Sequence, residues 1–243
     1  CIIYIALYMK KRKKRYQFKR QFIKTIKRKS FEKMIALTKK DYLSECLNVE
    51  PLKEGDRLFV ESNDMSDSFL NRSKANNEIV MPEAYINTAL WLLDLIKLSN
   101  NNLVKDGYIF PALYCFRHYL ELIMKDSIHY FKVNNSEISS EELGYDGKHG
   151  LIKLWEILKV YLHDDCEVNM VDKLITQLNE FDKGSTSFRY PFDYDNRNKI
   201  IIEYTYPPMM INIYELKKRM LQLYSFFEGV NSLSREFSEV DTY

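Results

Sequence analysis

The sequence predicts a mainly α-helical protein, an up-and-down bundle of four or five helices with a small β-hairpin inserted before the last helix. Three observations support this prediction. The 243 residues include only 7 Gly and 6 Pro, too few for an all-β chain with many tight turns. Several long stretches repeat apolar residues at helical spacing, and one short stretch alternates apolar and polar residues around a turn. Amphipathic helices joined by short connections pack as a bundle.

The expected helices follow one another along the main body of the chain. The first begins at Pro82, because proline suits the first turn of a helix, and the Asn100–Asn102 run ends it. In the expected hairpin, SFRYPFD and KIIIEYTYP flank a DYDNRN turn, within residues 188–206. The remaining helices are expected at residues 104–131, 150–162, 167–182 and 207–230.

Composition divides the chain into four parts: a basic N-terminal arm (1–40), a connector (41–81), the helical bundle (82–230) and a loose tail (231–243). The connector is rich in Ser, Asn and Asp, as loops are. The tail follows the last apolar stretch of the final helix. We therefore expect one helical domain with appendages.

Positive charge is concentrated in the basic arm, and acidic residues outnumber basic ones in the rest of the chain. Residues 10–29 contain 12 Lys or Arg and no Asp or Glu, which leaves 24 basic and 34 acidic residues elsewhere. The arm is either a solvated tail or a basic amphipathic helix that contacts RNA phosphates or a membrane surface. Residues 1–8 are apolar but too short to span a bilayer, and Met9 is a candidate start. We assign residues 1–8 no function and expect no transmembrane segment.

Several motifs that mark metal sites or particular classes of enzyme are absent from the sequence. Cys1, Cys46, Cys115 and Cys166 form no CxxC pair, so zinc and disulfide interpretations are weak and a reducing, cytoplasmic location is the default. Glycine loops that cradle phosphate, a GxSxG elbow and an HExxH pair are absent. The sequence therefore predicts no metal and no cofactor, and gives no support to ATPase, hydrolase or metalloprotease activity.

The most informative stretch is residues 108–130, an apolar helix that carries charge. Arg117, Glu121 and Lys125 are spaced i, i+4, i+8 and fall on one helical stripe, beside His118. The stripe is either an ordinary ladder of ion pairs, worth about 0.2–0.5 kcal/mol per pair, or the lining of a cleft.

Three motifs in order resemble the bacterial HEPN-like helical proteins: FRHYLELIMK, then KHGLIKLWEIL, then FDKGSTSFRYP. The resemblance covers residues 82–230. It implies a four- or five-helix bundle that often dimerises. It also implies either a metal-independent endoribonuclease of toxin–antitoxin or defence systems, or a non-catalytic binder of RNA or nucleotides. Catalytic members carry a His four to six residues beyond an Arg, but Arg117 is followed there by Leu122, Ile123 and Met124.

We can still assign candidate roles to the charged residues. For RNA cleavage, Arg117 would be the cation facing the phosphorane, His118 the acid or base, and Glu121 the group that orients them. Alternatively, the stripe is structural, and Arg189 ties the hairpin to Glu121 or Asp182. Both interpretations predict that Arg189 approaches the Arg117 helix. The candidate nucleic-acid contacts are Lys125, His149, Arg189 and Tyr190, of which His149 is alternatively a helix cap.

Two hypotheses follow. In the first, the chain is an RNA-associated HEPN-like protein of toxin or defence type, a homodimer with a cognate antitoxin or another protein as partner. In the second, it is a non-catalytic helical interaction module whose charged stripe is structural or binds a partner protein.

Overall fold

A computed structural model describes residues 50–51, 53–60, 64, 68, 74–132, 150–162, 166–182, 185, 187–189, 192–195, 200–204 and 208–240. The chain divides into two units, Cys1–Leu70 and Asn71–Tyr243. In the first unit, a tight turn forms where the Lys53 amide donates to Asp56 Oδ2 at 2.7 Å. Gly55 has φ +94° in this turn, a conformation that glycine adopts without a steric penalty. The basic arm lies outside the described residues.

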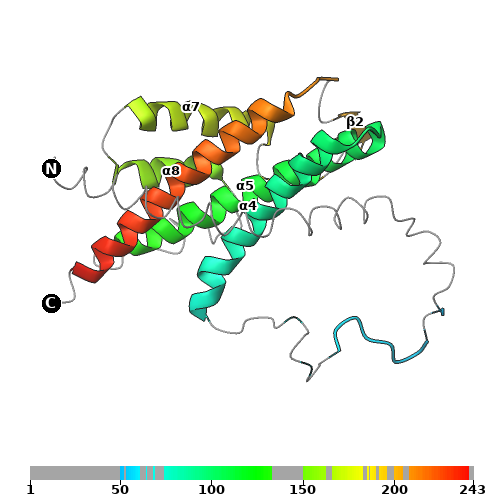
Figure 1. Ribbon diagram of the computed structural model, residues 1–243, viewed down its shortest axis with the longest axis horizontal. Coiled ribbons are helices and arrows are strands. Elements are labelled where there is room, and N and C mark those ends of the chain that lie inside the picture. The colour runs from blue at the N-terminus through cyan, green and yellow to red at the C-terminus, as the bar shows by residue number, and fades with distance from the viewer. Residues whose placement is uncertain are drawn as a thin grey trace. The chain divides into compact units, whose positions relative to one another are not determined.

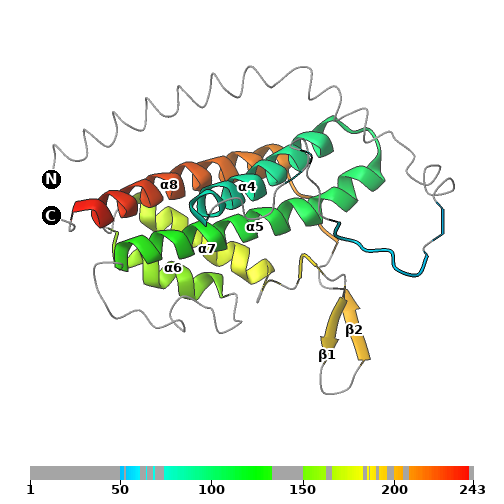
Figure 2. The ribbon, with the colours of Figure 1, turned by 90° about the horizontal axis from the view of Figure 1, so that it is seen from below.

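The second unit is mainly α-helical, as the sequence predicts (Figure 1). Its described helices are α4 (Lys74–Leu98), α5 (Asn102–Lys132), α6 (Leu151–Lys159), α7 (Cys166–Phe181) and α8 (Ile213–Val240). Two short strands, β1 (Phe192–Asp195) and β2 (Ile200–Tyr204), pair antiparallel with a register irregularity after Asp193. Figure 2 shows α4 and α8 on one side of α5, and α6 and α7 on the other. Helix α5 is therefore the centre of the bundle.

The core forms where apolar faces of all five helices meet. Among its fully buried side chains are Leu93, Leu120, Met124, Ile128, Trp155 and Phe227. The Trp155 ring contacts Phe226 and Phe227 edge-on, with centroids 6.2 and 6.0 Å away. Such packing joins α6 to α8, although more than 50 residues separate them.

Trp155 is also held by a polar contact that depends on pH. Its Nε1–H donates to Asp172 Oδ1 at 2.8 Å. This bond, and one from Lys159, keep the pKa of Asp172 below its ordinary value. The stability that the carboxylate contributes is therefore complete above its unfolded-state pKa and is lost as the pH falls below about 4.

We expect Asp172→Asn to reduce the acid sensitivity of the fold. Urea unfolding at a series of pH values should show a smaller drop in unfolding free energy below about pH 4 in the variant than in the wild type. The difference should be under about 1 kcal/mol, because the Asp172 side chain is 38% exposed. Equal drops in the two proteins would exclude this role for Asp172.

Helix α4 begins eight residues before the predicted start, so part of the predicted connector is helical. Pro82 lies inside the helix and not at its first turn. The turns before Pro82 are held by a residue distant in sequence, because the Tyr130 hydroxyl donates to Glu78 Oε2 at 3.1 Å. Proline marks a helix start only when nothing stabilises the preceding turn.

Helix α8 also differs from its predicted bounds. It begins at Ile213, after the expected start at residue 207, and continues to Val240, where the sequence predicted a loose tail from residue 231. The extra turns contact the rest of the bundle, since Ser234 is fully buried. The prediction of a loose segment is therefore wrong for residues 231–240.

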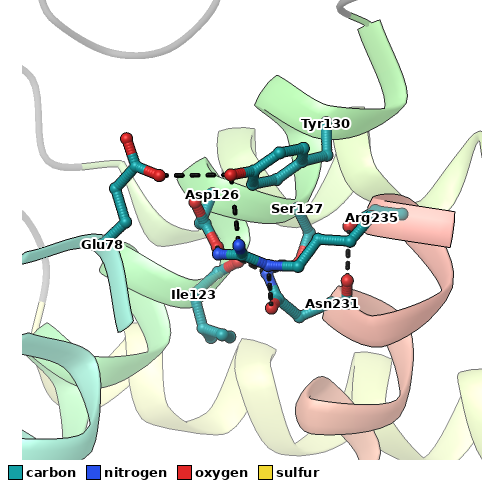
Figure 3. Close-up of polar contacts among 8 residues, drawn as sticks. Glu78, Ile123, Asp126, Ser127, Tyr130, Asn231 and Arg235 are labelled. Atoms are coloured by element: carbon teal, nitrogen blue, oxygen red, sulfur yellow. Dashed lines mark hydrogen bonds and ion pairs between the residues drawn. The ribbon is translucent and has the colours of Figure 1, made fainter. Parts of the chain in front are cut away.

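A polar cluster fixes these last turns of α8 (Figure 3). Arg235 Nη2 donates to Asp126 Oδ2 at 2.6 Å, and its Nη1 donates to the Tyr130 hydroxyl at 3.1 Å. Asn231 Nδ2 also donates to Asp126 Oδ2, at 2.7 Å. The Arg235 guanidinium lies over the Tyr130 ring, 4.3 Å from its centroid. Through the Tyr130–Glu78 bond, the cluster connects α8, α5 and α4.

Candidate functional site

The charged stripe of α5 forms an ion-pair ladder directed into the bundle. Arg117 Nη1 lies 3.4 Å from Glu121 Oε2, and Lys125 Nζ lies 2.8 Å from Glu121 Oε1. The i, i+4 spacing places the three side chains on consecutive turns of one face. Arg117 is 0% exposed and Glu121 is 2% exposed. The carboxylate of Glu121 therefore receives a different cation on each oxygen.

A second carboxylate completes the environment of Arg117. Arg117 Nε lies 3.0 Å from Oδ2 of Asp182, the residue that follows α7, and Asp182 is fully buried. The other oxygen, Oδ1, accepts a hydrogen bond from the Ser187 amide at 2.8 Å. Asp182 thus fixes α5 with one oxygen and the segment after α7 with the other. We call Arg117, Glu121, Lys125 and Asp182 the buried clamp.

From the sequence, Asp182 is expected only as a partner for Arg189, and its pairing with Arg117 is not predicted. One local signal pointed to its role. An Asp at the end of a helix, before a Gly-Ser-Thr-Ser segment, often accepts hydrogen bonds from backbone amides that follow it. Ser185, in that segment, has φ +63°, which shows how tightly the chain turns. The long-range pairing to Arg117 has no comparable sequence signal.

The charges within the buried clamp balance. Burial lowers the pKa of Arg117, Asp182 and Glu121 raise it, and Arg189 lowers it. Arginine stays protonated in proteins despite such shifts. Two cations therefore face two carboxylates, and removing any one would leave the buried charges unbalanced. This arrangement neutralises the four charges of the buried clamp.

His118 has surroundings that differ from those of Arg117. Successive residues of a helix point about 100° apart, so the neighbour of an inward-facing arginine projects elsewhere. The His118 ring is half-buried, edge-on to Tyr85 with centroids 4.4 Å apart. It lies parallel to the Tyr114 ring, with centroids 6.0 Å apart. Arg117 and His118 are adjacent in sequence but have different surroundings.

Arg189 reaches α5, as the sequence predicts, and contacts it beside His118. Its Cζ lies 5.9 Å from the Tyr114 ring centroid, and its Nε donates to the Ser185 carbonyl at 2.5 Å. Arg189 is exposed, unlike Arg117. Tyr85, Tyr114, His118 and Arg189 therefore gather at one place, which we call the Tyr114 patch. The sequence does not predict a role for the two tyrosines, because aromatic residues at helical spacing usually belong to the core.

Tyr85 of the Tyr114 patch and the neighbouring Cys115 are unsuited to nucleophilic chemistry. Burial raises the pKa of the Cys115 thiol, so the reactive thiolate is disfavoured. The pKa of the Tyr85 hydroxyl is raised chiefly by burial and, to a smaller extent, by the neighbouring Tyr114 and Cys115. Binding through aromatic faces and a cation suits this place better than covalent catalysis.

Two of the predicted nucleic-acid contacts have no described position. His149 and Tyr190 lie outside the described residues. Asp193 and Glu203 are opposite each other in the backbone register of β1 and β2. Within the described ranges, no three His, Cys, Asp or Glu side chains are grouped as metal ligands would be.

Comparison with protein-family models, with curated proteins and with solved structures gives no match to this chain.

Proposed function

We propose that this chain is a non-catalytic helical binding module, and that the charged stripe of α5 stabilises its bundle. The observation that carries the proposal is the burial of Arg117 between Glu121 and Asp182, with no exposed surface. A cation that stabilises a phosphorane must contact the phosphate oxygens. With its side chain enclosed by protein groups, Arg117 is available to Asp182 and Glu121 and not to RNA.

The separation of His118 from Arg117 supports the same proposal. Acid–base cleavage of RNA needs the imidazole and the cation around one phosphodiester, within hydrogen-bonding distance of its oxygens. Here His118 packs against two tyrosine rings, while Arg117 is paired inside the bundle. The carboxylate of Glu121, the third predicted catalytic residue, already forms ion pairs with both Arg117 and Lys125.

We expect the purified wild-type protein and its His118→Ala variant to leave RNA equally intact in chelator-treated buffer. The assay should follow an end-labelled single-stranded RNA by gel electrophoresis, with circular dichroism confirming that both proteins are folded. Cleavage by the wild type that disappears in folded His118→Ala would contradict the proposal. It would favour the metal-independent endoribonuclease interpretation instead.

A second candidate function, RNA association of the HEPN-like kind, is favoured by the Tyr114 patch. An exposed arginine over a tyrosine ring, next to a histidine, combines a phosphate-binding cation with rings on which bases stack. The 12 basic residues of segment 10–29 would add sequence-independent affinity. A toxin or defence role, a homodimer and a cognate antitoxin remain proposals that rest on the family resemblance.

If the Tyr114 patch contacts RNA, Arg189→Ala should weaken binding to single-stranded RNA and reduce the slope of log K against log salt. Loss of one phosphate contact corresponds to a slope change of about 0.7. Arg219→Ala is the matched control, because Arg219 is exposed on α8 and pairs there with Glu215. Equal affinities and slopes for the two variants, by fluorescence anisotropy, would remove the patch from RNA binding.

A further inference from the structure

Three chain segments meet at one end of the bundle. Helix α4 ends at Leu98, and α5 begins four residues later at Asn102. The start of α8 lies beside the end of α4, because Lys97 Nζ is 5.5 Å from the Tyr214 ring centroid and Lys217 forms an ion pair with Asp94. The residues that precede α8 therefore come to the same end as the α4–α5 connection.

Large apolar side chains project from this end. Met210 is 99% exposed, Leu103 84%, Tyr214 63% and Leu98 50%. Met209 and Ile211 beside them are also exposed. We call these residues the apolar end: Leu98, Leu103, Met209, Met210, Ile211 and Tyr214. Single exposed apolar residues are common, but several large ones gathered at one end of a bundle indicate an interaction site.

The outer face of α4 extends this apolar surface away from the end. Trp91 is 54% exposed, about two turns before Leu98. By length and composition alone, Glu78–Leu98 could cross a membrane, yet only a third of this window is buried in the bundle. The inner face of the helix packs on α5 and α8 as an ordinary bundle helix does. A helix that is apolar on both sides has a second apolar surface to cover.

The charge around the apolar end identifies the kind of surface that would cover it. Residues 94–106 and 208–219 hold five Lys or Arg and three Asp or Glu. Two of these carboxylates, Asp94 and Glu215, are already paired with cations of α8. The excess charge is positive, and a two-fold contact with a second copy would bring the excess cations of both copies together. An anionic surface would instead face them with opposite charge.

We propose that the apolar end docks the protein on an anionic lipid surface. Protruding Leu and Met side chains enter the acyl region, while Tyr214 and Trp91 take up the headgroup level, where such rings are favoured. Lys97 and Lys218, both exposed, contact lipid phosphates. Apolar insertion and positive charge are the two signals that stable peripheral binding needs, and segment 10–29 adds further cations.

The test is co-sedimentation of the full chain with phosphatidylcholine vesicles that do or do not contain phosphatidylserine. We expect the wild type to bind only the vesicles with phosphatidylserine. The double variant Leu103→Glu, Met210→Glu should lose apparent affinity by about tenfold or more, since insertion of two large apolar side chains is removed. Both positions are strongly exposed, and a glutamate in the first turn of α5 suits the helix dipole, so the fold should survive.

Val160→Glu is the matched control. Val160 is 81% exposed, but its neighbour Tyr161 stacks on Phe131 at the far end of α5. Phe131 is about 42 Å from Leu103 along the helix. This variant should bind the anionic vesicles as the wild type does. Binding unchanged in the double variant, or lost equally in Val160→Glu, would overturn the proposal. Unchanged binding in the double variant would leave segment 10–29 as the contact.

Tryptophan fluorescence gives a second, independent measurement. The chain has two tryptophans, and Trp155 is fully buried, so a change in polarity on docking reports on Trp91. Vesicles with phosphatidylserine should shift the emission of the wild type and of Val160→Glu to shorter wavelength. The double variant should show no shift. A shift that depends on protein concentration without vesicles would favour a second copy as the occupant and overturn the lipid proposal.

Discussion

Asp182→Ala is expected to destabilise the bundle by about 3–5 kcal/mol, because it leaves the fully buried Arg117 without one of its two carboxylates. It also leaves the Ser187 amide without its acceptor. A loss of this size is a large fraction of the 5–15 kcal/mol that stabilises a typical domain. The effect would come from an acidic residue just beyond the end of α7, whose pairing with Arg117 the sequence did not predict.

Urea unfolding followed by circular dichroism measures this effect. Asp182→Asn is the milder companion variant, since its amide oxygen still accepts from Ser187 while the charge is removed. Asp106→Ala is the control, because Asp106 is an exposed carboxylate near the start of α5. It should change the unfolding free energy by no more than about 0.5 kcal/mol. If Asp182→Ala were as mild as Asp106→Ala, Asp182 would not be part of a buried clamp.

Arg235→Ala is expected to cost about 2–3 kcal/mol, the next largest effect. The substitution removes a charge-assisted hydrogen bond to Asp126, a bond to the Tyr130 hydroxyl and a cation–aromatic contact (Figure 3). Asp126 keeps Asn231 as a donor, which limits the loss. Arg219→Ala, on the exposed side of the same helix, should cost no more than about 0.5 kcal/mol.

The same denaturant series decides whether the last turns of α8 belong to the bundle. Amide hydrogen exchange adds a local measurement, because Arg235→Ala should expose amides of residues 231–236 before the rest of α8. Exchange at these amides as fast as in an unfolded peptide, already in the wild type, would return this segment to the loose tail that the sequence predicted.

Local patterns predicted much of this fold. The long apolar stretch of α5 and the periodic stretch of α7 gave their helices to within about two residues, the usual uncertainty of helix ends. The ladder of Arg117, Glu121 and Lys125 was also predictable, since i, i+4 spacing alone brings these side chains together. Each of these features depends on residues close in sequence.

The features that the sequence missed depend on contacts between distant residues. Glu78 holds the start of α4 through Tyr130, 52 positions away, and Arg235 holds the end of α8 through Asp126, 109 positions away. Arg117 pairs with Asp182 across 65 positions. Such partners cannot be chosen from periodicity, because many polar residues are available and the tertiary fold selects one.

Helix geometry explains why Arg117 and His118 have different surroundings. Adjacent positions in a helix project about 100° apart, and Arg117 pairs with Asp182 while His118 packs against tyrosine rings. Arg117 and His118 are adjacent in the sequence motif, but the helix directs their side chains to different places. What gathers instead is Arg189 with His118 around Tyr114.

The central claim, that the charged stripe of α5 is structural, is tested most directly by a double-mutant cycle on Arg117 and Asp182. Unfolding free energies of the wild type, Arg117→Met, Asp182→Asn and the double variant give the coupling free energy of the pair. We expect the sum of the losses of unfolding free energy in the two single variants to exceed the loss in the double variant by about 1–3 kcal/mol. Additive losses would contradict the account, because they would mean that Arg117 and Asp182 do not stabilise the fold through each other.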